Sequence, residues 1–327
     1  MKRRDFVILL ASAVLGWART ARGQPASGRP LIGFLDGKSQ SAGEGLTRAF
    51  QQGLRELGYD EGRNIEIVYR FADGRDDRLP GLADELVRLN PAVILAPGVN
   101  AAVAAKNVTT RIPIVSWALA DAVHLGLVES YARPGRNITG IAPYVEGLPA
   151  KQMELAREVV PGAMKVGLLG NTNDPKGPPQ RNELEEAGHS LKVKVIFSEL
   201  RNLEELDSAM SFLTNEHVDV VIVLQTALTL SERRRIAASA IANRLPTVFG
   251  YRENVDAGGL ISYGVNLRWC SHRAATFVDK ILRGASAGEL PLEFPTELEM
   301  VVNVRTAKAL GLVVPPLLVA RADVVID

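Results

Sequence analysis

Asn137-Ile-Thr-Gly-Ile-Ala-Pro-Tyr-Val-Glu-Gly147 divides the chain into two halves in which strands and helices follow the same order. Before it, short apolar runs rich in β-branched residues alternate with amphipathic stretches, at residues 31–35, 65–69, 92–96 and 113–117. After it, the alternation resumes at residues 164–170, 193–198, 218–224 and 246–250. Continuous apolar runs are typical of parallel strands that helices cover on both faces. The sequence therefore predicts an α/β protein of two lobes, each built on a parallel sheet.

Length and composition agree with two lobes. A chain of 327 residues exceeds the size at which a single hydrophobic core usually stops growing. The formal net charge is +1, with 23% charged residues, whereas a nucleic-acid surface needs a clear excess of positive charge. We therefore expect no nucleic-acid partner.

The N-terminus is typical of an export signal. Met1-Lys-Arg-Arg-Asp-Phe6 is basic, residues 6–17 are apolar, and Ala21-Arg-Gly23 is a small-x-small cleavage motif. The apolar run is too short for a helix to cross the roughly 30 Å hydrocarbon core of a bilayer. Paired arginines favour the twin-arginine route over the general secretory one, although the run also fits an ordinary signal. We expect residues 1–23 to be removed near Gly23 and Gln24 and the mature chain to be periplasmic.

A phosphate-binding loop is not indicated at Gly37-Lys38-Ser39, although this tripeptide follows a predicted strand. Such a loop needs a glycine five residues before the glycine of the Gly-Lys pair, with four residues between them, so that backbone N–H groups surround a phosphate. Ile32 occupies that position, and Gly33 lies one residue too close. A polar loop that faces a ligand is the better interpretation.

The side chains that usually carry catalysis or bind metals are scattered. Cys270 is the only cysteine, and its spacing from apolar neighbours predicts a buried thiol. The histidines lie far apart, without the spacing of metal ligands, at His124, His189, His217 and His272. A nucleophile motif and a dinucleotide fingerprint are both missing from the sequence. We therefore expect no enzyme activity, no cofactor and no metal.

Polar, small and aromatic residues gather where the predicted strands end. In α/β sheets ligands bind beyond the carboxyl ends of the strands, where loops and helix N-termini converge. Any single position could be an ordinary turn residue, but the two halves converge on the same crevice. The candidate ligand-binding residues are Asp36, Lys38, Ser39, Gly98, Asn100, Ala101, Trp117, Asp121, Tyr144, Asn171, Asn173, Gln225, Tyr251, Glu253 and Tyr263.

Several short segments together resemble a known family, the substrate-binding proteins of ABC transporters, in the branch usually labelled tryptophan/tyrosine transport. The resemblance covers nearly the whole mature chain. It rests on Arg3-Arg-Asp-Phe6, Ile32-Gly-Phe-Leu35, Gly53-Leu-Arg-Glu-Leu-Gly-Tyr59, Ile112-Pro-Ile-Val115, Gly126-Leu-Val128, Arg133-Pro-Gly-Arg-Asn-Ile-Thr-Gly140, Gly258-Gly-Leu-Ile-Ser-Tyr-Gly264 and Thr306-Ala-Lys-Ala-Leu-Gly-Leu312.

The resemblance implies a type I periplasmic binding protein fold, with two Rossmann-like lobes joined by three crossings and no catalysis. Residues 28–143 and about 266–293 would form the first lobe, and residues 144–265 and about 294–327 the second. Hinges are expected near residues 141–145, 250–266 and 290–296. Two loops depart from the family pattern: Asp36 stands where many relatives carry a small hydroxyl residue, and Pro97-Gly-Val99 where Thr-Gly-Gly is usual. The ligand therefore cannot be carried over directly.

The expected function is the capture of a small polar or zwitterionic solute, with amino acids and aromatic compounds as candidates. Asp121 or Glu253 would bind an ammonium group, and the loops at residues 36–39 and 98–101 a carboxylate. Lys38 would pair with an anion or stay an exposed lysine. Aromatic rings would enclose the ligand body, namely those of Trp117, Tyr144, Tyr251 and Tyr263.

The expected partners are a membrane permease and its separate ATPase, and the chain is expected to be a monomer. A sensor that reports ligand to a membrane signalling protein, and a cofactor-dependent α/β enzyme, remain alternatives. Neighbouring permease and ATPase genes would favour transport over sensing. A dinucleotide fingerprint or an acid–base pair would favour an enzyme.

Overall fold

The computed structural model describes residues 28–143, 145, 147–296 and 298–327. The predicted export signal and Tyr144 lie outside these residues. Within the described part of the chain, no helix combines the length and the apolar character needed to cross a lipid bilayer.

The first sheet is fully parallel and has the strand order β2-β1-β3-β4-β5. Its strands are β1 (Leu31–Asp36), β2 (Glu66–Phe71), β3 (Val93–Leu95), β4 (Ile114–Ser116) and β5 (Ile138–Gly140). Its helices are α1 (Gln40–Glu56), α2 (Leu79–Arg88), α3 (Val99–Val108) and, from much later in the chain, α10 (Leu267–Leu282). A short 3-10 helix, η1 (Asp76–Arg78), precedes α2.

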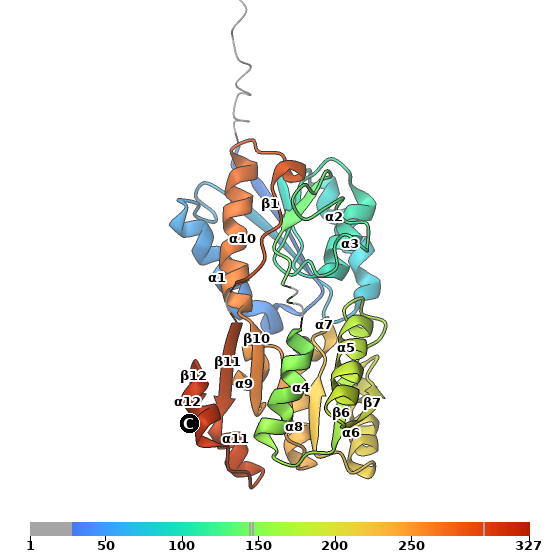
Figure 1. The fold of residues 1–327 in the computed structure, drawn as a ribbon. Coiled ribbons are helices and arrows are strands. Elements are labelled where there is room, and N and C mark those ends of the chain that lie inside the picture. The colour runs from blue at the N-terminus through green and yellow to red at the C-terminus, as the bar shows by residue number, and fades with distance from the viewer. Residues whose placement is uncertain (1–27, 144, 146, 297) are drawn as a thin grey trace, which may run out of the picture.

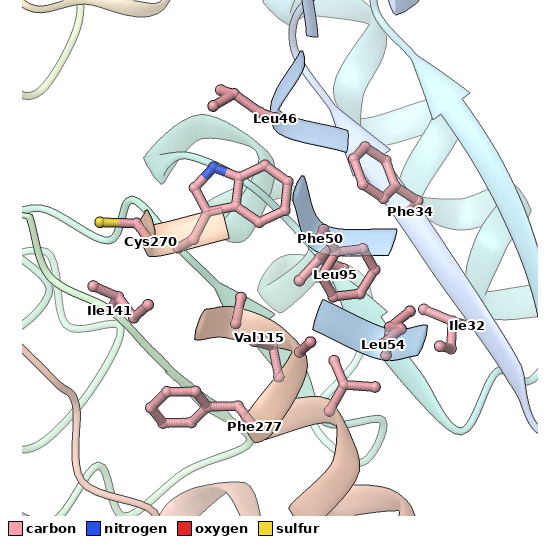
Figure 2. Packing of buried hydrophobic residues seen from close by; sticks show 14 of the residues in the cluster. Ile32, Phe34, Leu46, Phe50, Leu54, Leu95, Val115, Ile141, Cys270 and Phe277 are labelled. Atoms are coloured by element: carbon pink, nitrogen blue, oxygen red, sulfur yellow. The ribbon is translucent and has the colours of Figure 1, made fainter. Parts of the chain in front are cut away.

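Alternating side chains of the central strands explain why helices cover both faces of the first sheet. Ile32 and Phe34 of β1 point to the face covered by α1 and α10, and they belong to the same hydrophobic cluster as Phe50 and Phe277 (Figure 2). Leu35 points to the opposite face, which α2 and α3 cover. The continuous apolar run therefore supplies both cores, as expected for a strand buried on both faces.

The second sheet has seven strands in the order β12-β11-β10-β9-β8-β6-β7. They are β6 (Lys165–Gly170), β7 (Lys194–Glu199), β8 (Val220–Val223), β9 (Thr247–Phe249), β10 (Ile261–Val265), β11 (Leu298–Asn303) and β12 (Val324–Ile326). The accompanying helices are α4 (Leu148–Val159), α5 (Gly177–Ser190), η2 (Leu203–Glu205), α6 (Leu206–Asn215), α7 (Ala227–Ser231), α8 (Arg233–Ala242), α9 (Arg252–Asp256), α11 (Val304–Ala309) and α12 (Pro316–Arg321).

The chain passes between the two sheets three times, and the sheets lie at opposite ends of the molecule (Figure 1). The passages follow β5, β10 and the 3-10 helix η3 (Ala287–Glu289). At the third passage, Glu293 forms an isolated parallel bridge with Ile141, and the Glu293 backbone N–H donates to the Gly140 carbonyl at 3.0 Å. The Arg273 guanidinium also pairs with the Glu293 carboxylate at 2.7 Å. This architecture confirms the predicted fold class, whereas the lobe boundaries stay a prediction.

Three local predictions were incomplete or wrong. β11 pairs with β10 in the antiparallel sense, so the second sheet is mixed. α12 and β12 form in the C-terminal tail, where the sequence pattern predicts neither element. Residues 118–128 form turns, although the spacing of Leu125 and Val128 predicts a short helix there. Asp121 and Gly126 there have φ angles of 52° and 61°, and such left-handed residues interrupt a right-handed helix.

Candidate functional site

Two neighbouring cavities lie between the sheets. The inner cavity has a volume of about 50 Å³ and is lined by Asp36, Gly37, Lys38, Leu46, Asp76, Pro97, Gly98, Val99, Asn100, Ala101, Trp117, Ala118, Asp174, Lys176, Thr226, Ala227, Leu230, Tyr251 and Leu267. The larger cavity has a volume of about 230 Å³ and is lined by Ala120, Asp121, Tyr131, Pro143, Val145, Leu148, Pro149, Pro175, Lys176, Pro179, Gln180, Gln225 and Tyr251. Lys176 and Tyr251 contribute to both.

The loop after β1 brings a buried ion pair to the inner cavity. Asp36 is the last residue of β1, and its Oδ1 accepts from the Lys38 backbone N–H at 3.0 Å and from Lys38 Nζ at 2.8 Å. Ser39 then caps α1, because its Oγ accepts from the Ala42 N–H at 3.2 Å. Asp36 is 1% exposed, and its Oδ2 has no hydrogen-bond partner among the described residues. An unpaired buried carboxylate oxygen is costly, so this atom needs a donor.

The loop after β3 presents the start of α3. Gly98 has a φ angle of 95°, which favours glycine, and it precedes α3 without a side-chain cap. The first N–H groups of a helix have no partner within it and attract anions. Asn100, in the first turn, donates from Nδ2 to Asp76 Oδ2 at 2.7 Å. This edge of the cavity therefore combines free backbone donors with a carboxylate.

The second sheet contributes Asp174, which joins two loops. Its Oδ1 accepts from the Lys176 N–H and its Oδ2 from the Ala227 N–H, both at 3.0 Å. The first bond fixes the loop after β6, and the second ties that loop to the start of α7 after β8. Thr226 caps α7 through its own hydroxyl. Asp174 is 6% exposed, so its charge lies in a largely buried setting.

Lys176 and Tyr251 form a polar contact where the two cavities meet. Burial acts to lower the pKa of Lys176, but the Tyr251 oxygen and the Asp174 carboxylate outweigh it, and the pKa is raised. Burial raises the pKa of Tyr251, while the Lys176 ammonium acts in the opposite direction. The lysine is therefore charged and the phenol neutral at neutral pH, and a hydrogen bond joins them.

The larger cavity is mainly apolar, with polar groups at its margin. Gln180 holds the loop after β8, because its Oε1 accepts from the Gln225 N–H at 2.8 Å. Asp121 lines the same cavity in a left-handed conformation with φ of 52°. Tyr131 packs edge-on against Phe294 with ring centroids 5.0 Å apart. Such walls suit an apolar ligand body next to a few polar contacts.

Most of the predicted ligand-binding residues line these cavities. The inner cavity includes Asp36, Lys38, Gly98, Asn100, Ala101, Trp117 and Tyr251. The larger cavity includes Asp121, Gln225 and Tyr251. The linings of both omit Ser39, Asn171, Asn173, Glu253 and Tyr263.

Trp117 belongs to the hydrophobic core as much as to the cavity. It is 1% exposed, and its ring centroid lies 5.9 Å from that of Phe34 and 6.1 Å from that of Phe50. Figure 2 shows Phe34, Phe50 and Leu46 in this cluster. In this conformation the indole supports the cavity wall and offers a ligand little surface.

Three charged residues of the inner cavity were missed among the candidates. They are Asp76, Asp174 and Lys176. The available signal was positional, because residues 171–179 follow β6 as residues 36–43 follow β1. Among the described residues, no group of three or more His, Cys, Asp or Glu side chains is arranged to hold a metal ion.

Comparison with known proteins agrees with this architecture. A tyrosine-binding protein of Clostridioides difficile (strain R20291) is 28% identical over 265 residues, which are 81% of this chain and 76% of that protein. The structure of an ABC domain in complex with L-Trp from Streptococcus pneumonia has a TM-score of 0.85 and 21% identity and covers 91% of this chain and 100% of that one.

The ligand-free, open structure of a substrate binding protein with adhesive properties from Clostridium difficile has a TM-score of 0.64 and 26% identity. The match covers 88% of this chain and 96% of the chain in that structure. A family model described as ABC transporter substrate binding protein matches residues 38–326. The chain therefore belongs to the ABC transporter substrate binding protein family and has the type I periplasmic binding protein fold.

Proposed function

We propose that this chain is the solute-binding component of an ABC importer and that its ligand is an amino acid with an aromatic side chain. The observation that carries the proposal is the inner cavity, whose polar wall combines Asp36 and Asn100 beside the first sheet with Asp174 and Thr226 beside the second. A solute held by both sides favours the closed arrangement through contacts that an open one lacks.

The two cavities suit the parts of such a ligand. The polar inner cavity would take the charged groups of the ligand. The ligand carboxylate would bind at the start of α3, and the ligand ammonium group would bind to a carboxylate of the protein. The larger cavity, which Tyr131 and Leu148 line, would take the ring. Asp121 lines that cavity and remains a candidate for the ammonium group, whereas Glu253 would need a rearrangement to reach a ligand.

The proposed setting is the periplasm, after removal of residues 1–23. The closed, loaded chain, as a monomer, would dock on a membrane permease whose separate ATPase drives release. Family membership and the tyrosine-binding relative support the transport role and the class of ligand.

A thermal-shift screen of residues 24–327 with the standard amino acids tests the proposal. A ligand at 100 times its Kd stabilises the folded state by about 2.7 kcal/mol, a clear rise in Tm. We expect tyrosine, tryptophan or phenylalanine to give this rise and small aliphatic amino acids to give little. Stabilisation by none of the aromatic amino acids would refute the proposed ligand class.

A further inference from the structure

The charges around the inner cavity do not balance. Its lining contains three carboxylates, Asp36, Asp76 and Asp174, but two ammonium groups, Lys38 and Lys176. Carboxylates and ammonium groups confined together are most stable when the charges compensate. The wall of the cavity therefore has one negative charge in excess.

Both lysines already have partners. Lys38 lies 2.8 Å from Asp36 Oδ1, and both side chains are buried. Lys176 interacts with Asp174 and donates a hydrogen bond to Tyr251. Neither ammonium group is left to compensate a third carboxylate.

Asp76 is the carboxylate without a cation. The ion pairs in the described part of the chain include Asp77 with Arg75 at 2.9 Å but neither Asp76 nor Asp174. The charge of Lys176 acts on Asp174, whereas no cation is among the groups that shift the pKa of Asp76. Its Oδ2 accepts from the neutral Asn100 amide at 2.7 Å. Burial raises the pKa of Asp76, the Asn100 bond lowers it, and the charge of Asp174 raises it again. Asp76 keeps an exposed surface, so a ligand can approach it.

A second acceptor in the same wall lacks a donor. Oδ2 of Asp36 is buried and has no hydrogen-bond partner among the described residues. The two oxygens of Asp174 each accept one backbone N–H and can each accept a further bond. Spare acceptors therefore surround the cavity, whereas its side-chain cations are already paired.

We infer that the ligand must carry a positively charged nitrogen, which Asp76 binds from the side of the first sheet and Asp174 from the side of the second. The inference rests on the proposed function and goes further, because it makes the ammonium group obligatory and names the two carboxylates that hold it. A cation between two carboxylates from opposite sheets would also hold the sheets together. The body of the ligand would extend past Lys176 and Tyr251 into the larger cavity.

Matched probes separate the contributions of the two charged groups. Tyrosine, tyramine and 3-(4-hydroxyphenyl)propanoate share the same 4-hydroxyphenyl ring. Tyrosine carries both charged groups, tyramine carries only the ammonium group, and the acid carries only the carboxylate. We expect calorimetry to show tyrosine and tyramine binding within about tenfold of each other. The acid should bind about 100-fold more weakly or not at all.

The substitutions Asp76→Asn and Asp77→Asn remove the same charge at adjacent positions. Asp76→Asn should weaken the binding of tyrosine and of tyramine by about tenfold or more, which is the loss expected for one charge-assisted hydrogen bond. Asp77→Asn should leave both affinities within about twofold, because Asp77 pairs outward with Arg75. Circular dichroism of both variants would show whether the fold is intact.

The outcomes distinguish the two proposals. If the wild type binds tyrosine but the two variants bind it equally well, the role of Asp76 is refuted and the proposed function stands. Binding of the acid as tight as that of tyramine would refute the requirement for a cation. If no aromatic amino acid or amine binds the wild type, the proposed function fails and the inference fails with it.

Discussion

Glu253 is a carboxylate held in an unfavourable setting away from both cavities. It lies in the first turn of α9, its side chain is 12% exposed, and Arg268 Nε lies 3.7 Å from its Oε1. Neither carboxylate oxygen has a hydrogen-bond partner among the described residues. Burial is the main effect and raises the pKa of Glu253, although its own N–H and Arg268 act against the rise.

Replacing Glu253 with Gln should therefore change how stability depends on pH. A raised pKa means that the folded protein keeps this proton at a pH where the unfolded chain has lost it. Stability then increases as the pH falls through the pKa of the folded state. Urea unfolding at about pH 7 and about pH 5 should show a smaller gain on acidification for Glu253→Gln than for the wild type.

At about pH 7 the Gln variant should be at least as stable as the wild type, since the charge that burial penalises is gone. Glu289→Gln is the control, because Glu289 is exposed. Equal gains on acidification in the wild type and in Glu253→Gln would show that the carboxylate does not carry the effect.

Adjacent residues show where prediction from sequence ends. Asp76 and Asp77 have the same chemistry and the same neighbours, and a charged loop is usually solvated. Only the folded chain distinguishes them, because Asp76 meets Asn100 from α3 while Asp77 meets Arg75. Asp36 could be identified as a candidate ligand-binding residue from the sequence, because it ends a clearly apolar strand at the edge of the sheet where ligands bind.

The packing of α1 against α10 depends on a small residue at the contact. Gly53 lies on the buried face of α1. A Cβ there would lie 2.5 Å from the His272 carbonyl oxygen and 2.9 Å from Ala275 Cβ, both in α10. Backbone atoms of a packed helix cannot move aside independently. Any side chain at position 53 would therefore push the two helices apart.

Two alanine substitutions in α1 test this contact. Gly53→Ala should destabilise the protein by about 1–3 kcal/mol, the usual cost of overpacking. Gly45→Ala, on the exposed face of the same helix, should stabilise it by about 0.5–1 kcal/mol, because a Cβ there meets nothing within 4 Å. Thermal unfolding of both variants measures the difference, and a loss of stability in both would point to helix α1 itself as the cause.

Elements with strong periodic patterns were predictable, and those fixed by tertiary contacts were not. The central strands were found because both faces are apolar. The direction of β11 is set by its pairing with β10, which the local sequence does not encode. β12 has three residues, too few for a pattern, and it forms because β11 offers it a paired edge. Leu125 and Val128 have helical spacing, but the left-handed backbone at Asp121 and Gly126 prevents the helix.

At the scale of the whole molecule, we expect the two sheets to separate before a ligand enters. The inner cavity holds about 50 Å³, whereas ligand pockets usually measure roughly 300–1,000 Å³. Its walls come from both sheets, so separating them about the three passages enlarges it. Asp76 and Asp174 repel each other across the cavity when no cation lies between them, which favours opening.

Small-angle X-ray scattering can therefore detect the cation as a closing agent. Without ligand, the wild type should have a larger radius of gyration than it has with saturating tyrosine or tyramine. A ligand shifts this equilibrium only by its difference in affinity for the two arrangements, and a charge contact made by both sheets supplies such a difference.

Ligand-free Asp76→Asn should be more compact than the ligand-free wild type, because one of the two repelling charges is gone. Asp77→Asn should scatter like the wild type. Equal radii for all three ligand-free proteins would mean that repulsion between the two carboxylates does not control opening, and an unchanged radius on tyrosine binding would mean that the sheets do not close on the ligand.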